Sequence, residues 1–192
     1  MNQYRQQIFS LIYSRLNPLG PLNNALDFGS GDGWFTNMFA TEGLVKNVVA
    51  IDVKHLLHAQ IVPLIYKGDK LPFEDKLFDL VYSIDSLHHC NNPKNSLKEL
   101  ARCSKKYILI KDHTYETFSD WLALCALDIK GNWGTGVECF YNYQHRFEWL
   151  NSLEQEDFKL EWFIYPMQCC SGLIGSLTKG FQFMGLWTPL IR

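Results

Sequence analysis

The stretch Ala25-Leu26-Asp27-Phe28-Gly29-Ser30-Gly31-Asp32-Gly33-Trp34 decides the fold of this chain, because an apolar run ends there in an acidic residue and alternating glycines. A run of this kind is typical of a buried strand, and glycines directly after it let the backbone adopt positive φ and approach a ligand closely. The free N–H groups of a following helix attract negative charge. The stretch therefore predicts a strand, a tight turn and a helix that together cradle a nucleotide-like ligand.

Two other interpretations of this turn stay open. Glycine-rich turns also occur as ordinary strand-to-helix connections, and a short glycine pattern alone is a weak indication of function. A dinucleotide-binding turn places its third glycine where this chain has Trp34, so the spacing of Gly29, Gly31 and Gly33 disfavours a nicotinamide dinucleotide.

Length and composition are those of a globular protein with one core. The 192 residues are 47% hydrophobic and 20% charged, without an internal repeat or a linker, so we expect one domain over residues 1–192. The 18 basic and 20 acidic residues give a net charge of −2. This balance disfavours a nucleic-acid substrate, because proteins that bind phosphate backbones carry an excess of basic charge.

The cysteines and the two ends of the chain favour a cytoplasmic protein without a membrane span. The cysteines form no C-x-x-C pair and have no companion histidines at zinc-like spacing, so we expect reduced thiols and no metal site. Residues 1–20 contain an amphipathic helix over residues 2–16 and do not form a signal peptide. Residues 162–191 carry only the charge of Lys179, but polar residues interrupt them, which favours buried strands or an apolar surface over a membrane span.

Strand-like and helix-like segments alternate after the first helix, which is typical of a parallel sheet with crossover helices. We expect strands at residues 24–28, 47–52, 61–66, 78–84 and 107–111, and helices at 34–41, 54–59 and 93–103. The pattern changes from residue 113, where we expect helices at 117–129 and 144–156 and strands at 158–165 and within 181–190.

In such a sheet, ligands bind outside the carboxyl ends of the strands. The predicted strands end at polar residues in five places, and these residues should gather at one edge: residues 27–33, Asp52, residues 68–69, residues 85–89 and residues 111–113.

With these motifs in this order, residues 24–112 resemble the class I S-adenosylmethionine-dependent methyltransferases, and among them the branch called methyltransferase type 11. The resemblance is carried by the motifs at residues 26–33, 48–52, 68–73, 78–81 and 87–89. It implies an α/β, Rossmann-like, doubly wound fold with a seven-stranded, mostly parallel sheet and an antiparallel last strand. It also implies S-adenosylmethionine as the methyl donor and S-adenosylhomocysteine as the product.

The resemblance implies a set of residues around the donor. Asp27, Gly29, Gly31 and Gly33 would surround the methionyl and ribose portion. Asp52 would accept hydrogen bonds from the ribose hydroxyls, and its two oxygens suit that role, although an aspartate there could instead cap a helix.

The adenine would lie further along the same edge. Asp69 would receive its amino group, the main-chain N–H of Lys70 would contact the ring, and Val53 and Leu71 would line the pocket. A Gly-Asp turn and ordinary core residues are the alternatives here. Ser83 would pass beneath the sulfonium. Asp85 follows it and would order the acceptor or the methionyl ammonium, or cap a helix.

Three histidines and a tyrosine are candidates for the acceptor side. His88, His89 and His113 could each act as a general base, because an imidazole titrates near neutral pH. Buried histidines that bond the backbone are the structural alternative. Residues 113–157, with Tyr143, are expected to form a helical substrate cap or, alternatively, an aromatic core around a helical hairpin.

Motifs of nucleic-acid methylation are missing from the sequence, since no Asn/Asp-Pro-Pro-Tyr motif occurs and Cys90 does not follow a proline. This favours a small-molecule or lipid-like acceptor. A non-catalytic methyltransferase-like partner or regulatory protein is the alternative from another class, and the apolar end of the chain is compatible with a partner or with a homodimer. An NAD-dependent oxidoreductase is the third, least favoured hypothesis.

Overall fold

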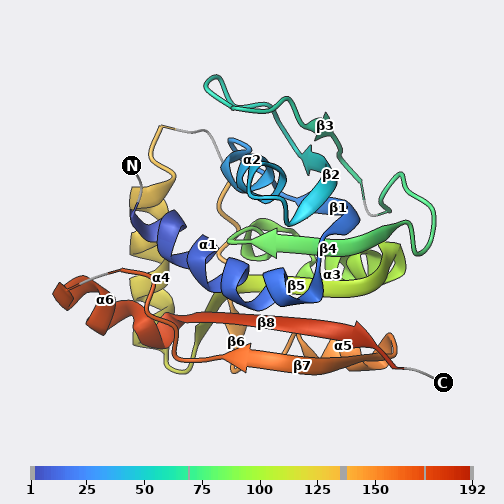
Figure 1. The fold of residues 1–192 in the computed structure, drawn as a ribbon. Coiled ribbons are helices and arrows are strands. Elements are labelled where there is room, and N and C mark those ends of the chain that lie inside the picture. Colours follow the sequence, from blue (N-terminus) through green and yellow to red (C-terminus); the bar gives the residue numbers. More distant parts are fainter. Residues whose placement is uncertain (1–2, 69, 135–137, 171, 191–192) are drawn as a thin grey trace.

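The computed structural model describes residues 3–68, 70–134, 138–170 and 172–190. An eight-stranded sheet with the order β3-β2-β1-β4-β5-β8-β7 runs through it, with β6 beside β5 (Figure 1). The strands are β1 (Leu22–Phe28), β2 (Val45–Asp52), β3 (Leu64–Ile65), β4 (Phe78–Ile84), β5 (Ser104–Tyr115), β6 (Gln144–His145), β7 (Phe158–Ile164) and β8 (Gln182–Pro189).

The strand directions confirm the expected fold class. β1 pairs in parallel with β2 and β4, and the pairs β2–β3, β4–β5 and β5–β6 are also parallel. The last strand, β8, runs antiparallel between β5 and β7. The short β6 is an addition to the seven strands that the resemblance implied.

Helices cover both faces of the sheet. They are α1 (Gln3–Leu16), α2 (Trp34–Thr41), α3 (Pro93–Cys103), α4 (Phe118–Gly131), α5 (Asn151–Gln155) and α6 (Gly172–Thr178), with 3-10 turns at Asn17–Leu19, Leu87–His89 and Lys179–Phe181. Along β4, Leu80 and Tyr82 pack with α1 and α2, whereas Val81 packs with α3 and α5. This alternation places a hydrophobic core on each side of the central strands, and Figure 1 shows α1 crossing one face.

Capping residues in the sequence fix two of the helix starts. The Oδ1 of Asn92 accepts a hydrogen bond from the N–H of Asn95 at 3.1 Å, directly before Pro93 in the first turn of α3. Thr117 and Asp120 form a capping box at the start of α4. Both are common ways to satisfy the free N–H groups of a first helical turn.

Two expected helices are wrong in whole or in part. Residues 54–59 form bends and turns, and the apolar Leu57 that suggested a helix is 94% exposed, so no packing stabilises one. In the expected helix at 144–156, β6 takes the first residues, and Arg146 and Phe147 have positive φ of 47° and 64°, so only α5 remains helical.

Two expected strands differ most in length from the observed ones, whereas β1 and β2 each begin two residues before the expected strands. β3 keeps only the middle of the expected strand at residues 61–66. β5 extends beyond the expected strand at 107–111, because β8 pairs with it as far as His113 and β6 pairs with Thr114 and Tyr115. His113 therefore lies within a strand and not after it.

The chain beyond residue 113 is a mixed segment. Residues 113–157 hold the end of β5, α4, β6 and α5, so the expected helical cap is only partly helical. In the C-terminal stretch, β8 is buried between β5 and β7. None of the helices in the described ranges has both the length and the apolar character needed to cross a membrane. All six cysteines are free thiols.

Candidate active site

The glycine turn between β1 and α2 has the backbone that its sequence predicts. Gly29, Gly31 and Gly33 have positive φ of 73°, 58° and 75°. A Cβ atom on Gly29 would lie 1.7 Å from the Oγ of Ser86, and one on Gly33 would lie 2.9 Å from the Cβ of Ile61. A Cβ atom on Gly31 would meet no described atom within 4 Å. The turn is therefore packed against its neighbours at both ends and open at Gly31.

Asp52, the last residue of β2, lies beside this open glycine. Its Oδ2 accepts a hydrogen bond from the N–H of Gly31 at 2.8 Å, and its Oδ1 accepts one from the N–H of Lys54 at 3.3 Å. The side chain is half-buried. Since a carboxylate has about four acceptor sites, capacity for further donors remains. The bond to Lys54 closes a turn and caps no helix, because residues 53–63 contain none.

Asp27 lies beneath the turn and is buried. Its Oδ2 accepts hydrogen bonds from the hydroxyls of Thr36, at 2.6 Å, and Tyr82, at 3.0 Å. Burial raises the pKa of Asp27 to about 7, although these two hydrogen bonds oppose the rise. The side chain thus fastens β1 to α2 and β4. Its expected place around a ligand stays a prediction.

The other expected donor contacts are spread along the same edge. Asp69 lies outside the described residues, while Lys70 and Val53 are exposed. Ser83 is fully buried at the end of β4, and its Oγ has no hydrogen-bond partner among the residues that the structure describes.

Leu71 is held in place by α3. Its N–H donates to the Oε2 of Glu99 at 2.8 Å, and the Nη2 of Arg102 donates to its carbonyl oxygen at 3.0 Å. The side chain of Leu71 is buried in the core, so this turn is fixed to the helix that covers the opposite face of the sheet from α1.

Two side chains of α1 reach the edge of the sheet, and the sequence analysis did not predict them. The Nη1 of Arg5 donates to the Oδ2 of Asp32 at 2.6 Å, and the hydroxyl of Tyr4 donates to the Oδ2 of Asp85 at 2.8 Å. The Oδ1 of Asp32 accepts the N–H of Trp34 at 3.2 Å, which links Arg5 to the start of α2. The amphipathic pattern of α1 indicates a packed helix, but it does not indicate which strand ends the helix crosses.

Asp85 belongs to a buried network of charges at the ends of β4 and β5. The ammonium of Lys111, whose side chain is fully buried, donates to the Oδ1 of Asp85 and, at 2.6 Å, to the Oε1 of Gln182. Burial alone would raise the pKa of the Asp85 carboxyl, but Lys111 and then His113 lower it below its usual value. The network therefore holds a buried ion pair at the edge where the site is expected.

The candidate catalytic side chains come together beside this network. The ring of His88 lies 4.1 Å from that of His89, 5.0 Å from that of His113 and 5.0 Å from that of Tyr143, measured between ring centroids. Side-chain exposure is 3% for His88 but 17% for His89 and 16% for His113. The structure thus gathers residues from three separate segments, with His88 innermost.

Two carboxylates contact these histidines. The Nδ1 of His88 lies 2.6 Å from the Oδ1 of Asp112, and its Nε2 lies 3.9 Å from the Oδ1 of Asp128. The Nε2 of His89 lies 3.5 Å from the same oxygen of Asp128. Sequence analysis assigned no role to Asp128, because its position forty residues downstream carries no signal of this contact.

These carboxylates set the charges of the cluster. Burial would lower the pKa of His88, but Asp112 and Asp128 outweigh it and raise that pKa to about 10. Burial and the charge of His88 lower the pKa of His89, whereas burial and Lys111 lower the pKa of His113. Burial, with Asp128, raises the pKa of Tyr143 above its usual value. The carboxylates therefore favour the charged form of His88, whereas burial favours the neutral forms of His89 and His113.

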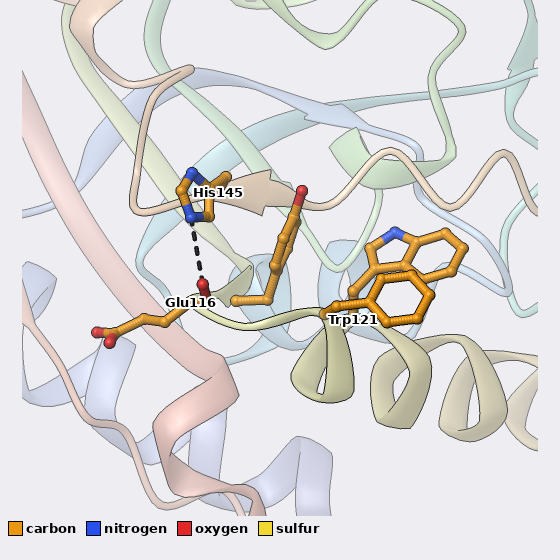
Figure 2. A pocket seen from close by; sticks show the side chains of 5 residues that line it. Glu116, Trp121 and His145 are labelled. Carbon is orange, nitrogen blue, oxygen red and sulfur yellow. Dashed lines mark hydrogen bonds between the residues drawn. The ribbon is translucent and has the colours of Figure 1, made fainter.

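A pocket of about 410 Å³ lies between the end of β5, the start of α4 and β6, and is lined by Tyr115, Glu116, Phe118, Trp121 and His145 (Figure 2). The rings of Phe118 and Trp121 stack at 5.7 Å, and the Nε2 of His145 lies 3.2 Å from the carbonyl oxygen of Glu116. Figure 2 shows the carboxylate of Glu116 pointing away from Trp121. Because Tyr115 is two residues after His113 on β5, both side chains lie on one face of the strand. Tyr115 therefore lines the pocket from the face of β5 that also carries His113.

Comparison with known proteins finds a family model that matches the part of the chain around this edge. Residues 26–107 match the family model described as a methyltransferase domain. This part of the chain is therefore similar to the type 11 branch of the class I methyltransferases. The match contains the glycine turn, Asp52 and the two adjacent histidines, but it ends before His113 and Tyr143.

Solved structures with the same fold include several methyltransferases. A putative methyltransferase of Haloferax volcanii, in complex with the activator Trm112, is 12% identical with a TM-score of 0.69, over 95% of this chain and 89% of that chain. A putative methyltransferase of Bacillus halodurans is 20% identical with a TM-score of 0.59, and the match covers 91% of this chain and 96% of that chain. A geranyl diphosphate methyltransferase, in complex with GPP and sinefungin, is 12% identical with a TM-score of 0.70, and the match covers 93% of this chain and 75% of that chain. At these identities the likeness shows the fold. The comparison with curated proteins gives no match.

Proposed function

We propose that this methyltransferase transfers the methyl group of S-adenosylmethionine to a small-molecule or lipid-like acceptor. The observation that carries the proposal is the hydrogen bond of 2.8 Å from the N–H of Gly31 to the Oδ2 of Asp52, on the open side of the glycine turn. The pair offers a half-buried carboxylate with unused acceptor sites beside backbone that a ligand can approach closely.

Features of the turn fit this donor. The Oγ atoms of Ser30 and Ser83 are buried without a hydrogen-bond partner among the described residues, one in the turn and one at the end of β4. Buried polar groups of this kind are usually satisfied, so they are candidates for bonds to a ligand. Negative charge is favoured at the start of α2, where Asp32 already accepts the N–H of Trp34.

Each residue that is predicted to surround the donor then has a role in binding. Asp52 accepts hydrogen bonds from the ribose hydroxyls, and Gly29, Gly31 and Gly33 let the backbone approach the methionyl portion. Asp27 holds the turn from below. Val53, Asp69, Lys70 and Leu71 border the adenine. Bound S-adenosylmethionine supplies a methyl group on a sulfonium, which is already an activated leaving group.

The acceptor is proposed to bind where the histidines are most accessible. His89 and His113 have the more exposed rings, so they would meet the acceptor first, while His88 and Tyr143 orient them from behind. The neighbouring pocket is lined mainly by aromatic rings, which favours an acceptor with an apolar portion. Positioning of two reactants can lower a barrier by about 7–11 kcal/mol, so holding the acceptor in line is the main task of these residues.

Calorimetry tests the donor. S-adenosylhomocysteine should bind to the purified protein, and NAD should not. Asp52→Ala should weaken binding by about tenfold to a hundredfold, since it removes hydrogen bonds to a charged acceptor worth about 1.5–3 kcal/mol. Glu74→Gln, at an exposed acidic residue of the same chain, is the matched control and should leave the affinity unchanged. Equal affinity in wild type and Asp52→Ala would remove Asp52 from the ribose role, and binding of NAD alone would overturn the proposal.

A protein partner is the second candidate, because large apolar side chains are exposed along α4 and just after it. Phe118, Leu122 and Ile129 of α4 and the following Trp133 are exposed, and exposed apolar surface often marks interaction sites. The Haloferax volcanii neighbour forms a complex with the activator Trm112. Gel filtration with light scattering, together with a methyl-transfer screen over several acceptor classes, separates the two: a non-catalytic partner would give no turnover with any acceptor.

A further inference from the structure

The histidines at the end of β4 and a carboxylate of α4 form a compact group of ligand atoms. The Oδ1 of Asp128 lies 3.5 Å from the Nε2 of His89 and 3.9 Å from the Nε2 of His88, and one ligand atom from each of the three residues lies within 4.8 Å of the others. In a tetrahedral zinc site, with metal–ligand bonds of about 2.0–2.2 Å, neighbouring ligand atoms lie about 3.3–3.6 Å apart. The observed distances are close to that spacing.

The Nδ1 atoms of His88 and His89 already have hydrogen-bond partners. The Nδ1 of His88 is 2.6 Å from the Oδ1 of Asp112, and the Nδ1 of His89 is 3.2 Å from the carbonyl oxygen of Glu138. Metal-binding histidines almost always donate the other ring N–H to a carboxylate or a backbone carbonyl, which fixes the tautomer and the ring orientation. Here both partners direct an Nε2 atom toward Asp128.

Asp128 itself has unused acceptor capacity. Its side chain is 9% exposed, its Oδ1 accepts a hydrogen bond from the Nδ2 of Asn132 at 2.5 Å, and its Oδ2 has no hydrogen-bond partner within the described ranges. Asp112, fully buried behind His88, adds a second negative charge to the cluster. Two buried carboxylates favour positive charge between them, because uncompensated buried charge is costly. Protonated His88 supplies that charge without a metal, and a metal ion that binds its Nε2 would supply it after displacing the proton.

We propose that His88, His89 and Asp128 bind a divalent transition-metal ion, with Zn²⁺ as the ion that this ligand set suits. Imidazole and carboxylate ligands suit Zn²⁺, and three protein ligands leave a fourth position for water or another small ligand. The site lies on the acceptor side and does not depend on which methyl donor binds. The ligand spacing in the sequence gives no sign of it, since α4 brings Asp128 to the histidines only in the folded chain.

The alternative trio of His88, Asp112 and His113 is less suitable. The Oδ1 of Asp112 already contacts the Nδ1 of His88 and accepts the N–H of His113 at 2.7 Å, and its Oδ2 accepts the N–H of Leu87 at 3.0 Å. Asp112 therefore orients a ligand and is not free to be one.

Metal titration tests the proposal. The purified protein is treated with a chelator, dialysed and titrated with Zn²⁺ by calorimetry. Wild type should bind Zn²⁺ in equimolar amount. Loss of an outer partner of a metal ligand typically weakens metal binding by about 10–100-fold. Asp128→Asn and His89→Gln change a ligand itself, so each should weaken Zn²⁺ binding by at least that factor. His55→Gln, at an exposed histidine outside the cluster, is the matched control and should bind as wild type does.

Cobalt provides a readout independent of activity. Co²⁺ bound by wild type and by His55→Gln should give the visible absorption of a low-coordinate site, and His89→Gln should lose it. Circular dichroism and cooperative thermal unfolding establish that each variant is folded, and His89→Gln carries the test if Asp128→Asn does not fold. Lack of saturable Zn²⁺ binding by wild type, or equal affinity in His89→Gln and His55→Gln, would overturn the proposal.

Discussion

Asp27 is the side chain on which the glycine turn rests, and its titration should be visible in the stability of the protein. Burial raises its pKa to about 7, with Asp52 and Asp32 adding to the rise, while an unfolded aspartate has a pKa of about 3.9. Between these values the folded protein holds a proton that the unfolded chain has lost. This contribution to stability is complete below about pH 4 and is lost as the pH rises through about 7.

Asp27→Asn should therefore flatten the dependence of stability on pH. The amide oxygen of asparagine can still accept the hydroxyls of Thr36 and Tyr82. We expect the unfolding free energy of the variant, relative to wild type, to be higher at pH 8 than at pH 5, by at most about 3 kcal/mol. Urea denaturation of both proteins at the two pH values measures this difference. Parallel pH profiles would show that Asp27 does not titrate in this range.

Gly29 should tolerate a side chain less well than another glycine with the same backbone conformation. Gly29 and Gly43 have φ of 73° and 72°, but a Cβ on Gly29 would lie 1.7 Å from Ser86 Oγ, while one on Gly43 would meet no described atom within 4 Å. Gly43→Ala should cost about 1–2 kcal/mol, the penalty of a left-handed conformation. Gly29→Ala should cost more and weaken S-adenosylhomocysteine binding, as measured by chemical denaturation and calorimetry. Equal losses in the two variants would contradict the close approach to Ser86.

The ion pair of Lys111 and Asp85 lies where β4, β5, β8 and α1 meet, because Gln182 of β8 contacts Lys111 and Tyr4 of α1 contacts Asp85. The two charged residues should therefore be strongly coupled in their effect on stability. Lys111→Met leaves Asp85 without its cation and should cost about 3–5 kcal/mol of unfolding free energy. The double variant Lys111→Met/Asp85→Asn should cost less than the sum of the two single changes. Lys106→Met, at an exposed lysine that pairs with Asp79, is the control and should cost at most about 1 kcal/mol. A double-mutant cycle with additive losses would contradict this account of the pair.

The start of α4 depends on Thr117, whose hydroxyl accepts the N–H of Asp120 at 3.2 Å. Thr117→Ala should destabilise the protein by about 1 kcal/mol, whereas Thr117→Ser should keep most of the cap. Thermal unfolding of the two variants measures the difference. If both variants unfold at the same temperature as wild type, the capping box contributes nothing to the stability of α4.

The elements with local signals are those that the sequence predicts well. The helix at Trp34–Thr41, the strand at Phe78–Ile84 and the helix at Pro93–Cys103 have the predicted bounds, because a glycine turn, an apolar run and an Asn-Pro cap mark their ends. The errors at residues 54–59 and 144–150 arise where apolar residues stay exposed or where pairing with β5 competes with a helix. Neither effect is local, so periodicity cannot reveal it.

Considered as a whole, the chain places its chemistry at one edge of the sheet, as the ordered motifs predict. The glycine turn, Asp52 and the histidines belong to segments far apart in the sequence, and parallel pairing brings their strand ends together. The contacts of Tyr4, Arg5 and Asp128 with this edge could not be predicted, because they depend on how α1 and α4 pack. Sequence thus predicts which strand ends lie at this edge better than which helix side chains contact it.

The central claim is that the open side of the glycine turn, with Asp52, holds the methyl donor. A crystal structure of the protein with S-adenosylhomocysteine tests this most directly. We expect both ribose hydroxyls within hydrogen-bond distance of the Asp52 carboxylate, the methionyl portion along residues 29–33, and the sulfur facing the histidine cluster. A ligand bound elsewhere, or one whose ribose makes no contact with Asp52, would contradict the account.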